Sequence, residues 1–209
     1  MIKRLLAILA VGVMMFDPVC AEDLRSLFIS MPDSIMPTLT KSERMDFLDY
    51  MDSGMRARVR NKLGGQSVMT DFSDKSLTIM TSQSGRTEMV LFPCGKGSNL
   101  ICIIKTVSAR FDDSRLSFYN EDWSPVDGQN LIELPQFDDF LTKEALKSDS
   151  LAVFKEESLL RLKSATSFDG GLVFRYTSLD YISEDANRYR SWIKPEIRYV
   201  WNGKRFKKR

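Results

Sequence analysis

Five short runs of β-branched and apolar residues occupy the middle of the chain and constrain its fold more than any other feature. Turn-forming residues separate them at a spacing of about 10 to 13 residues, which is typical of an antiparallel meander. The run LICII is apolar at every position, which predicts a central strand that is covered on both faces. Between residues 67 and 123 the runs are SVMTDFS, SLTIMTS, TEMVLFPC, LICIIKTVSA and SRLSFYNEDW.

Helical patterns precede this meander. Residues 23–31 predict a short helix that is followed by prolines. A second helix begins at TKSE, where Thr40 and Glu43 have the spacing of a capping box, and it ends near Gly54. The basic, glycine-ended segment 55–65 predicts one or two further helical turns and a solvated face.

The second helix carries acidic residues three apart, which raises the question of a metal or acid/base site. At 100° per residue, Asp46 and Asp49 fall opposite the apolar side, and Glu43 already has a capping role. A single solvated stripe does not converge on a pocket, so we expect no metal or catalytic site there. Arg44 falls among the apolar positions, and we predict that it meets Asp33 within about 6 Å.

The pattern after the meander is mixed. Residues 138–147 predict a helix, Ser183 is expected to cap another, and a hairpin whose turn is Asn202-Gly203 closes the chain. The sequence therefore predicts the α+β class, in which N-terminal helices pack on an antiparallel meander and a smaller helix and strand set follows. We expect one domain, 22–209, whose halves would be 22–135 and 136–209.

Residues 1–21 have the features of a secretory signal peptide. A cationic start precedes an unbroken apolar run, 5–16, and Val19 and Ala21 supply small residues at the −3 and −1 positions of a cleavage site. The run is too short to span a bilayer, which takes about 20 residues. We expect cleavage after Ala21 rather than lipidation of Cys20, and no transmembrane segment after cleavage.

The composition excludes several kinds of chemistry. The chain has no histidine, so it cannot carry a Ser-His-Asp or Cys-His site, a histidine-ligated zinc or a histidine pH switch. A net charge of +2 argues against nucleic acid as a partner, and no motif predicts a cofactor or a metal. Cys94 and Cys102 would remain in an oxidising compartment; two free thiols are expected, with a disulfide as the alternative if their hairpin loop is wide.

Aromatic residues are concentrated near the end of the meander and in the final hairpin. Exposed aromatic rings could stack on sugars or anchor a partner protein, although alternating aromatics on strands are often core residues. The candidate binding residues are Tyr119, Trp123, Tyr199 and Trp201.

Several segments together resemble an uncharacterised family of exported proteins of Gram-negative anaerobic bacteria. The resemblance covers most of residues 22–209, and its motifs are FISMPDSIMPTLTKSERMDFLDYM, RNKLGGQSVM, ICIIKTVSA and SFYNEDW. It implies export and a single domain of unknown function, and it implies no activity, substrate or catalytic residue.

Three functions are compatible with these observations. The first is a non-catalytic binding module of the periplasm or cell envelope, whose partner is an envelope protein or a polysaccharide. The second is a small-ligand or lipid carrier with an apolar pocket between helices and sheet. The third is a carboxylate-based hydrolase, with two acids within about 5 to 10 Å in a cleft. Its candidate acids are Asp33, Asp112, Asp113, Glu121 and Asp122.

Overall fold

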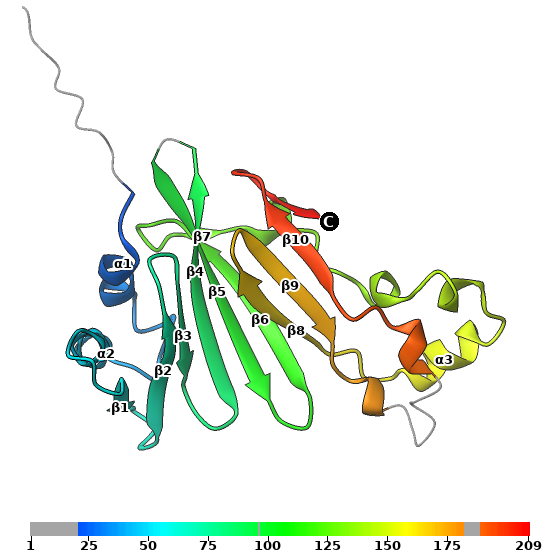
Figure 1. Ribbon diagram of the computed structural model, residues 1–209, viewed down its shortest axis with the longest axis horizontal. Coiled ribbons are helices and arrows are strands. Elements are labelled where there is room, and N and C mark those ends of the chain that lie inside the picture. The colour runs from blue at the N-terminus through cyan, green and yellow to red at the C-terminus, as the bar shows by residue number, and fades with distance from the viewer. Residues whose placement is uncertain (1–20, 96, 182–188) are drawn as a thin grey trace, which may run out of the picture.

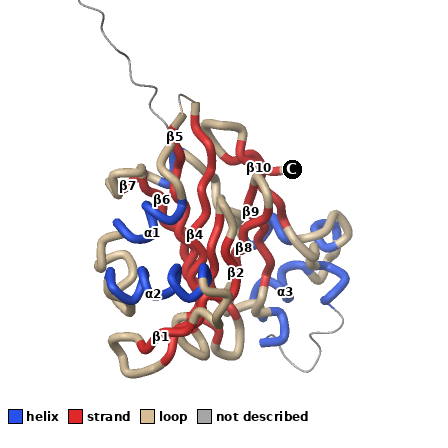
Figure 2. The backbone as a smooth tube through the Cα atoms, turned by 60° about the vertical axis from the view of Figure 1, so that its left-hand side comes forward, coloured by secondary structure: helices blue, strands red, loops and turns tan. Residues whose placement is uncertain are grey.

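The chain folds into two antiparallel sheets and a pair of helices that cover the first sheet, as the computed structural model shows (Figure 1). The structure describes residues 21–95, 97–181 and 189–209. Helices α1 and α2 lie on one side of the first sheet, while the second sheet and α3 lie toward the other end of the molecule (Figure 2). The α+β prediction is therefore confirmed.

The first sheet is a seven-stranded meander in which every strand pairs with its neighbours in the sequence. The five predicted runs form β2 to β6, which confirms the prediction for residues 67–123. The strands are β1 Arg58–Arg60, β2 Gln66–Phe72, β3 Ser76–Met80, β4 Gly85–Cys94, β5 Ser98–Ser108, β6 Asp112–Tyr119 and β7 Pro125–Val126.

The segment 55–65 does not form the predicted helical turns. It contains β1, whose residue Val59 is buried and pairs with Ser67 across a tight turn. The arginines in this segment alternate with apolar residues, which is the period of a strand rather than of a helix. Gly64 has a φ of 79° in the connecting turn, a conformation that favours glycine.

The central strand β5 is buried on both of its faces, as its apolar sequence predicts. Ile101 and Ile103 belong to a core that the first sheet shares with α1 and α2. Leu100, Cys102 and Ile104 belong to a second core, shared with the four-stranded sheet. Because successive residues of a strand point to opposite faces, one strand supplies both cores.

The two N-terminal helices, α1 Leu24–Ser30 and α2 Lys41–Asp52, pack on the first face of this sheet. The predicted capping box is confirmed. Thr40 accepts a hydrogen bond from the Glu43 N–H, and the Glu43 carboxylate accepts one from the Thr40 N–H. Asp52, at the end of the acidic stripe, pairs with Arg25 of α1, so this side of α2 contacts its neighbour helix and solvent.

The predicted contact between Asp33 and Arg44 is also confirmed. Arg44 is only 1% exposed, and its Nη1 atom lies 3.1 Å from Asp33 Oδ1. The same guanidinium donates to the carbonyl oxygens of Leu39, at 3.0 Å, and of Met31. One buried arginine thus holds both ends of the loop that joins the two helices.

The second sheet has the order β11-β10-β9-β8 and packs against the first. Its strands are β8 Lys163–Phe168, β9 Gly171–Tyr176, β10 Ile197–Trp201 and β11 Phe206–Lys208. Residues 138–147 form two 3-10 turns, Phe137–Phe140 and Ala145–Lys147, instead of the predicted helix, and α3 Leu151–Glu157 follows them. The remaining 3-10 turns are Gly128–Asn130, Leu179–Tyr181 and Arg190–Trp192.

The final hairpin forms as predicted, with a longer loop. Trp201 pairs with Phe206, so four residues connect the strands. The Asn202 side chain accepts hydrogen bonds from the N–H groups of Lys204 and Arg205, and Gly203 has a φ of 89°. The helix expected after Ser183 falls mostly on residues outside the described part of the chain.

Side chains of the first sheet accept hydrogen bonds from β8, the edge strand of the second sheet. The outward N–H groups of β8 are bonded in turn by Asp113 Oδ1, Ser114 Oγ and Glu88 Oε2, at 3.5, 2.9 and 3.0 Å. Buried Glu88 also accepts from the Ser167 hydroxyl. These contacts satisfy strand groups that would otherwise be unpaired at a sheet edge.

Both cysteines of the described chain are free, as expected. Cys102 is buried opposite Val90, which lies four residues, or about 13 Å, from the half-buried Cys94 along β4. A disulfide needs a much closer approach. Burial raises the pKa of both thiols, so they are poor nucleophiles at neutral pH.

We expect Arg44→Met to lower the free energy of unfolding by about 2 to 4 kcal/mol, because buried carbonyl oxygens lose their donor. The matched control is Lys62→Met, which removes the other, exposed partner of Asp33 and should cost less than about 1 kcal/mol. Urea unfolding of both variants measures the difference. Equal losses would show that Arg44 does not organise the interhelical loop.

Candidate functional site

A groove runs beside strand β6, between its outer edge and the chain that follows β7. It has a volume of about 880 Å³. Both faces of the strand contribute to it, because consecutive residues of β6 line its wall. The lining comprises residues 115–119, 125–129, 132–134 and 136.

The outer edge of β6 is unpaired over most of its length. On its inner side β6 pairs with β5 from Asp112 to Tyr119, whereas on its outer side it pairs with β7 only at Phe118 and Tyr119. In an antiparallel sheet, alternate residues direct both backbone groups to the same edge. Asn120 donates outward to Ser124, so the even-numbered residues of β6 face the open edge.

The Asp112 carbonyl accepts a hydrogen bond from the Thr177 hydroxyl at 2.6 Å, in agreement with this alternation. Between that contact and the pairing with β7 lie the outward backbone groups of Ser114 and Leu116. Within the described ranges, no strand pairs with them. Leu116 is the one of the two that lines the groove.

Three other strands at sheet edges are short or covered. The edge of β8 is bonded by side chains, as described above, and the edge strands β1 and β11 have three residues each. Short and blocked edges resist pairing with other chains. Strand β6 differs from these three strands because, within the described chain, it has outward backbone groups without a partner strand beside a groove of about 880 Å³.

The groove walls combine apolar and polar side chains. Leu116 and Val126 are half-buried, Ile132 is buried and Leu134 is exposed. Exposed polar residues lie along the same walls, with Arg115 on β6 and acids and amides on the facing segment: Asp127, Gln129, Glu133 and Gln136. Such walls can accept the alternating side chains of an extended segment.

Two of the predicted binding aromatics lie at this end of β6. Tyr119 is half-buried, lines the groove and contacts Trp123, with ring centroids 5.7 Å apart. Trp123 is 9% exposed, has a φ of 64° and donates its indole N–H to Ser30 Oγ at 3.2 Å. Tyr119 can therefore contact a ligand in the groove, while the ring of Trp123 packs in the core with α1.

The other two aromatics lie in the second sheet. Tyr199 is 4% exposed, and burial raises its pKa to about 12. Trp201 is half-buried, contacts the rings of Phe92 and Phe206, and donates to the Pro93 carbonyl at 2.8 Å. The structure does not bring the four aromatics together, and their role in binding stays a prediction.

The candidate acids of a hydrolase have partners of their own. Lys62 and Arg44 hold the pKa of Asp33 below its usual range, and hydrogen bonds from Ser124 do the same for Asp122. Glu121 accepts from the backbone and side chain of Asn99, each at 3.0 Å. Asp112 and Asp113 sit where β6 meets the second sheet.

None of these five acids lines the β6 groove, and the described residues contain no acid or cysteine cluster able to hold a metal ion. Within the same residues, no helix combines the length and hydrophobicity needed to cross a bilayer.

Residues 17–206 match the family described as "Protein of unknown function (DUF3256)". The chain belongs to this family. The resemblance to a family of unknown function is thereby confirmed, while export and the bacterial source of its members stay predictions. No curated protein matches this DUF3256 chain.

A solved structure shares the fold. It is described as "Structure of a domain of an uncharacterized protein from Porphyromonas gingivalis W83", with a TM-score of 0.78 and 23% identity over 89% of this chain and 98% of that one. At this identity the likeness establishes the arrangement of strands and helices and nothing about activity.

Proline substitutions test whether the edge of β6 is open. Leu116→Pro removes an outward N–H, whereas Ser117→Pro removes one that bonds β5 opposite Ile103. Each proline variant is compared with the alanine variant at the same position, so that the effect of removing the native side chain cancels. We expect the difference in the free energy of unfolding between the alanine and proline variants to be about 2 to 3 kcal/mol larger at position 117 than at position 116. Equal losses would mean that the Leu116 N–H is already bonded.

Proposed function

We propose that the protein is an exported, non-catalytic binding module whose β6 groove takes an extended segment of another protein of the cell envelope. The observation that carries this proposal is the unpaired edge of β6 beside an open groove with apolar and polar walls. An extended peptide that adds to a sheet edge gains affinity from main-chain hydrogen bonds and selectivity from pockets for alternate side chains.

The outward backbone groups of Leu116, which lines the groove, define what such a ligand must be. They are one donor and one acceptor that point out of the sheet, so they match the backbone of another strand. Each hydrogen bond formed contributes about 0.5 to 1.5 kcal/mol. Burial of ligand side chains against Leu116, Val126 and Ile132 supplies the rest of the affinity.

A polysaccharide has no regular row of amide groups to match these positions, so the open edge favours a protein ligand. The dispersed candidate acids give no support to the hydrolase alternative. The carrier alternative needs an apolar cavity, whereas the β6 groove carries charged side chains in its lining.

Export rests on the pattern of residues 1–21 and has its own test. The protein recovered from the cell envelope of its host should begin at Glu22, as measured by mass spectrometry of the intact chain. Replacing Ala21 with a bulky residue should block cleavage and retain the precursor, because the −1 position requires a small side chain. Recovery of a chain lipidated at Cys20, or of the uncleaved chain in the cytoplasm, would contradict this assignment.

Site-specific photo-cross-linking tests the groove. A photoreactive amino acid replaces Glu133, which is exposed and lines the groove, or the control residue Glu156, which is exposed on α3 outside it. After irradiation of intact cells, we expect a protein adduct from position 133 and none from position 156.

The same experiment is repeated in two backgrounds, since Leu116→Ala keeps the edge N–H and Leu116→Pro removes it. The adduct should persist in the alanine background and be lost in the proline background. Adducts from both positions alike, or a glycan in place of a protein, would refute the proposal.

A further inference from the structure

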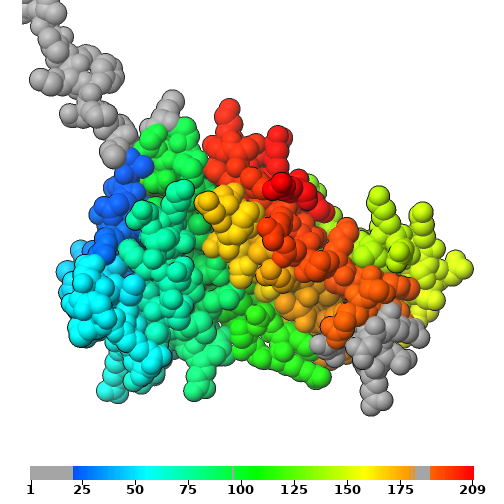
Figure 3. All heavy atoms as spheres, in the orientation of Figure 1, coloured from blue at the N-terminus to red at the C-terminus, as the bar shows by residue number. Residues whose placement is uncertain are grey.

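A second cavity lies behind the segment that forms the far wall of the groove. We call it the Phe137 pocket; its volume is about 380 Å³. It sits between the 3-10 turn at Phe137, the end of α3 and strands β8 and β9, at the end of the molecule that Figure 3 shows on the right in yellow-green and yellow. Its lining residues are Pro135, Gln136, Phe137, Asp138, Phe140, Lys155, Arg161, Lys163 and Tyr176.

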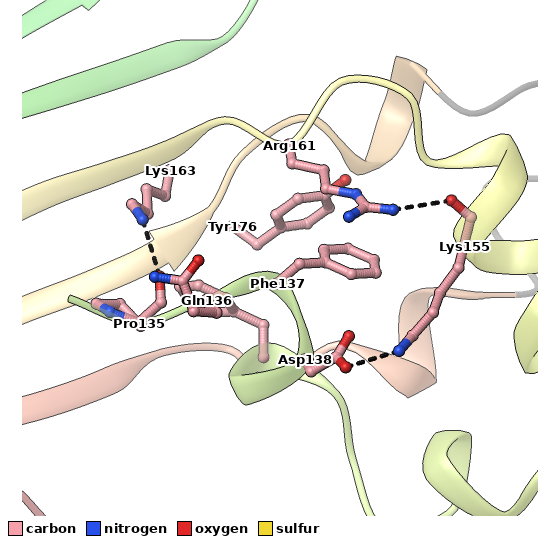
Figure 4. A pocket seen from close by; sticks show the side chains of 9 residues that line it. Pro135, Gln136, Phe137, Asp138, Lys155, Arg161, Lys163 and Tyr176 are labelled. Atoms are coloured by element: carbon pink, nitrogen blue, oxygen red, sulfur yellow. Dashed lines mark hydrogen bonds and ion pairs between the residues drawn. The ribbon is translucent and has the colours of Figure 1, made fainter. Parts of the chain in front are cut away.

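Arg161 holds its guanidinium over the ring of Phe137, with the central carbon 4.7 Å from the ring centroid (Figure 4). Its Nε donates to the Ser158 carbonyl and its Nη2 to the Lys155 carbonyl, both at 3.0 Å. These bonds cap the end of α3 and fix the plane of the guanidinium. They use two of its five N–H groups, and the others remain available to a ligand.

Lys163 supplies a second cation on the other side of the pocket (Figure 4). The side chain is half-buried, and its Nζ donates to the Pro135 carbonyl at 2.8 Å. Burial lowers the pKa of Lys163 below its usual value, and the negative charges of Asp113 and Asp139 offset only part of this effect. An ammonium group removed from water in this way gains more from an added anion than an exposed one does.

The carboxylate that lines the pocket already forms an ion pair. Asp138 is the acid in the lining, and it pairs with Lys155 at 2.7 Å. Within the described residues, Arg161 and Lys163 contact carbonyl oxygens and form no ion pair with a carboxylate. Arg161 and Lys163 are therefore held in place by neutral carbonyl groups, next to the aromatic rings of Phe137 and Tyr176, and their positive charges can attract an anion.

We infer that the Phe137 pocket binds a small organic anion, whose carboxylate or phosphate group takes the free N–H groups of Arg161, while Lys163, on the other side of the pocket, donates to the body of the same ligand. The planar guanidinium offers paired donors that match either oxyanion, and the aromatic floor of Phe137 and Tyr176 accommodates the body of the ligand. The volume suits one ring of sugar size, such as a uronic acid or a sugar phosphate.

Titration monitored by NMR tests this site, with inorganic phosphate, D-glucuronate and D-glucose as probes at constant ionic strength. We expect saturable shifts at Phe137 and Tyr176 with at least one anion and none with neutral glucose. The stronger of the two anions identifies the group that the site prefers. Absence of saturable shifts with both anions, or equal shifts with glucose, would overturn the inference.

Three variants separate ligand binding from the capping role of Arg161. Lys163→Gln leaves the cap of α3 intact, Arg161→Lys keeps the charge and loses the paired donors, and Lys75→Gln removes an exposed cation that does not line the pocket. We expect the first two to weaken anion binding by about 10- to 100-fold and the third to leave it unchanged. Equal weakening by Lys163→Gln and Lys75→Gln, which each remove one positive charge, would show a net-charge effect only and overturn the site.

The pocket does not depend on the peptide-binding proposal. Lys163→Gln should leave the cross-link from position 133 intact, and Leu116→Pro should leave the anion titration unchanged. Failure of one proposal therefore leaves the other standing.

Discussion

The two-sided burial of strand β5 is the constraint on which the rest of the structure depends. β5 pairs with β4 over ten residues and with β6 over eight, and its alternate side chains enter two different cores. A strand that is apolar on both faces needs a layer on each side. Helices α1 and α2, joined through buried Arg44, provide one layer, and the four-stranded sheet provides the other.

The way the second sheet docks decides which sheet edge stays open. Its edge strand β8 crosses the first sheet, and the outward N–H groups of β8 donate hydrogen bonds to the side chains of Asp113, Ser114 and Glu88. The edge of β8 is therefore satisfied, whereas the outer edge of β6 has, among the described residues, no partner strand on the N-terminal side of Phe118. The candidate peptide groove is thus a consequence of the same docking that completes the second core.

One short stretch of chain connects the two proposed sites. Leu134 and Gln136 line the groove, whereas Gln136 and Phe137 line the anion pocket behind it. Both cavities therefore share a wall that has little regular structure of its own. The remaining walls belong to regular elements, which are β6 and β7 for the groove and α3, β8 and β9 for the Phe137 pocket.

The sequence by itself determined the features that depend on neighbours along the chain. The period of two with turn residues between the runs predicted the meander, Thr40 and Glu43 predicted the helix cap, and the position of Arg44 predicted its contact with Asp33. The three-residue strand at Val59 was not predicted, because a segment this short has too few residues to show a clear period and becomes a strand only by pairing with β2, where Val59 lies opposite Ser67. Only the tertiary structure decided that Tyr199 is buried, that Ser114 of one sheet bonds Ala165 of the other, and where a groove and a pocket lie. These features arise from packing between segments far apart in the sequence, which no local pattern records.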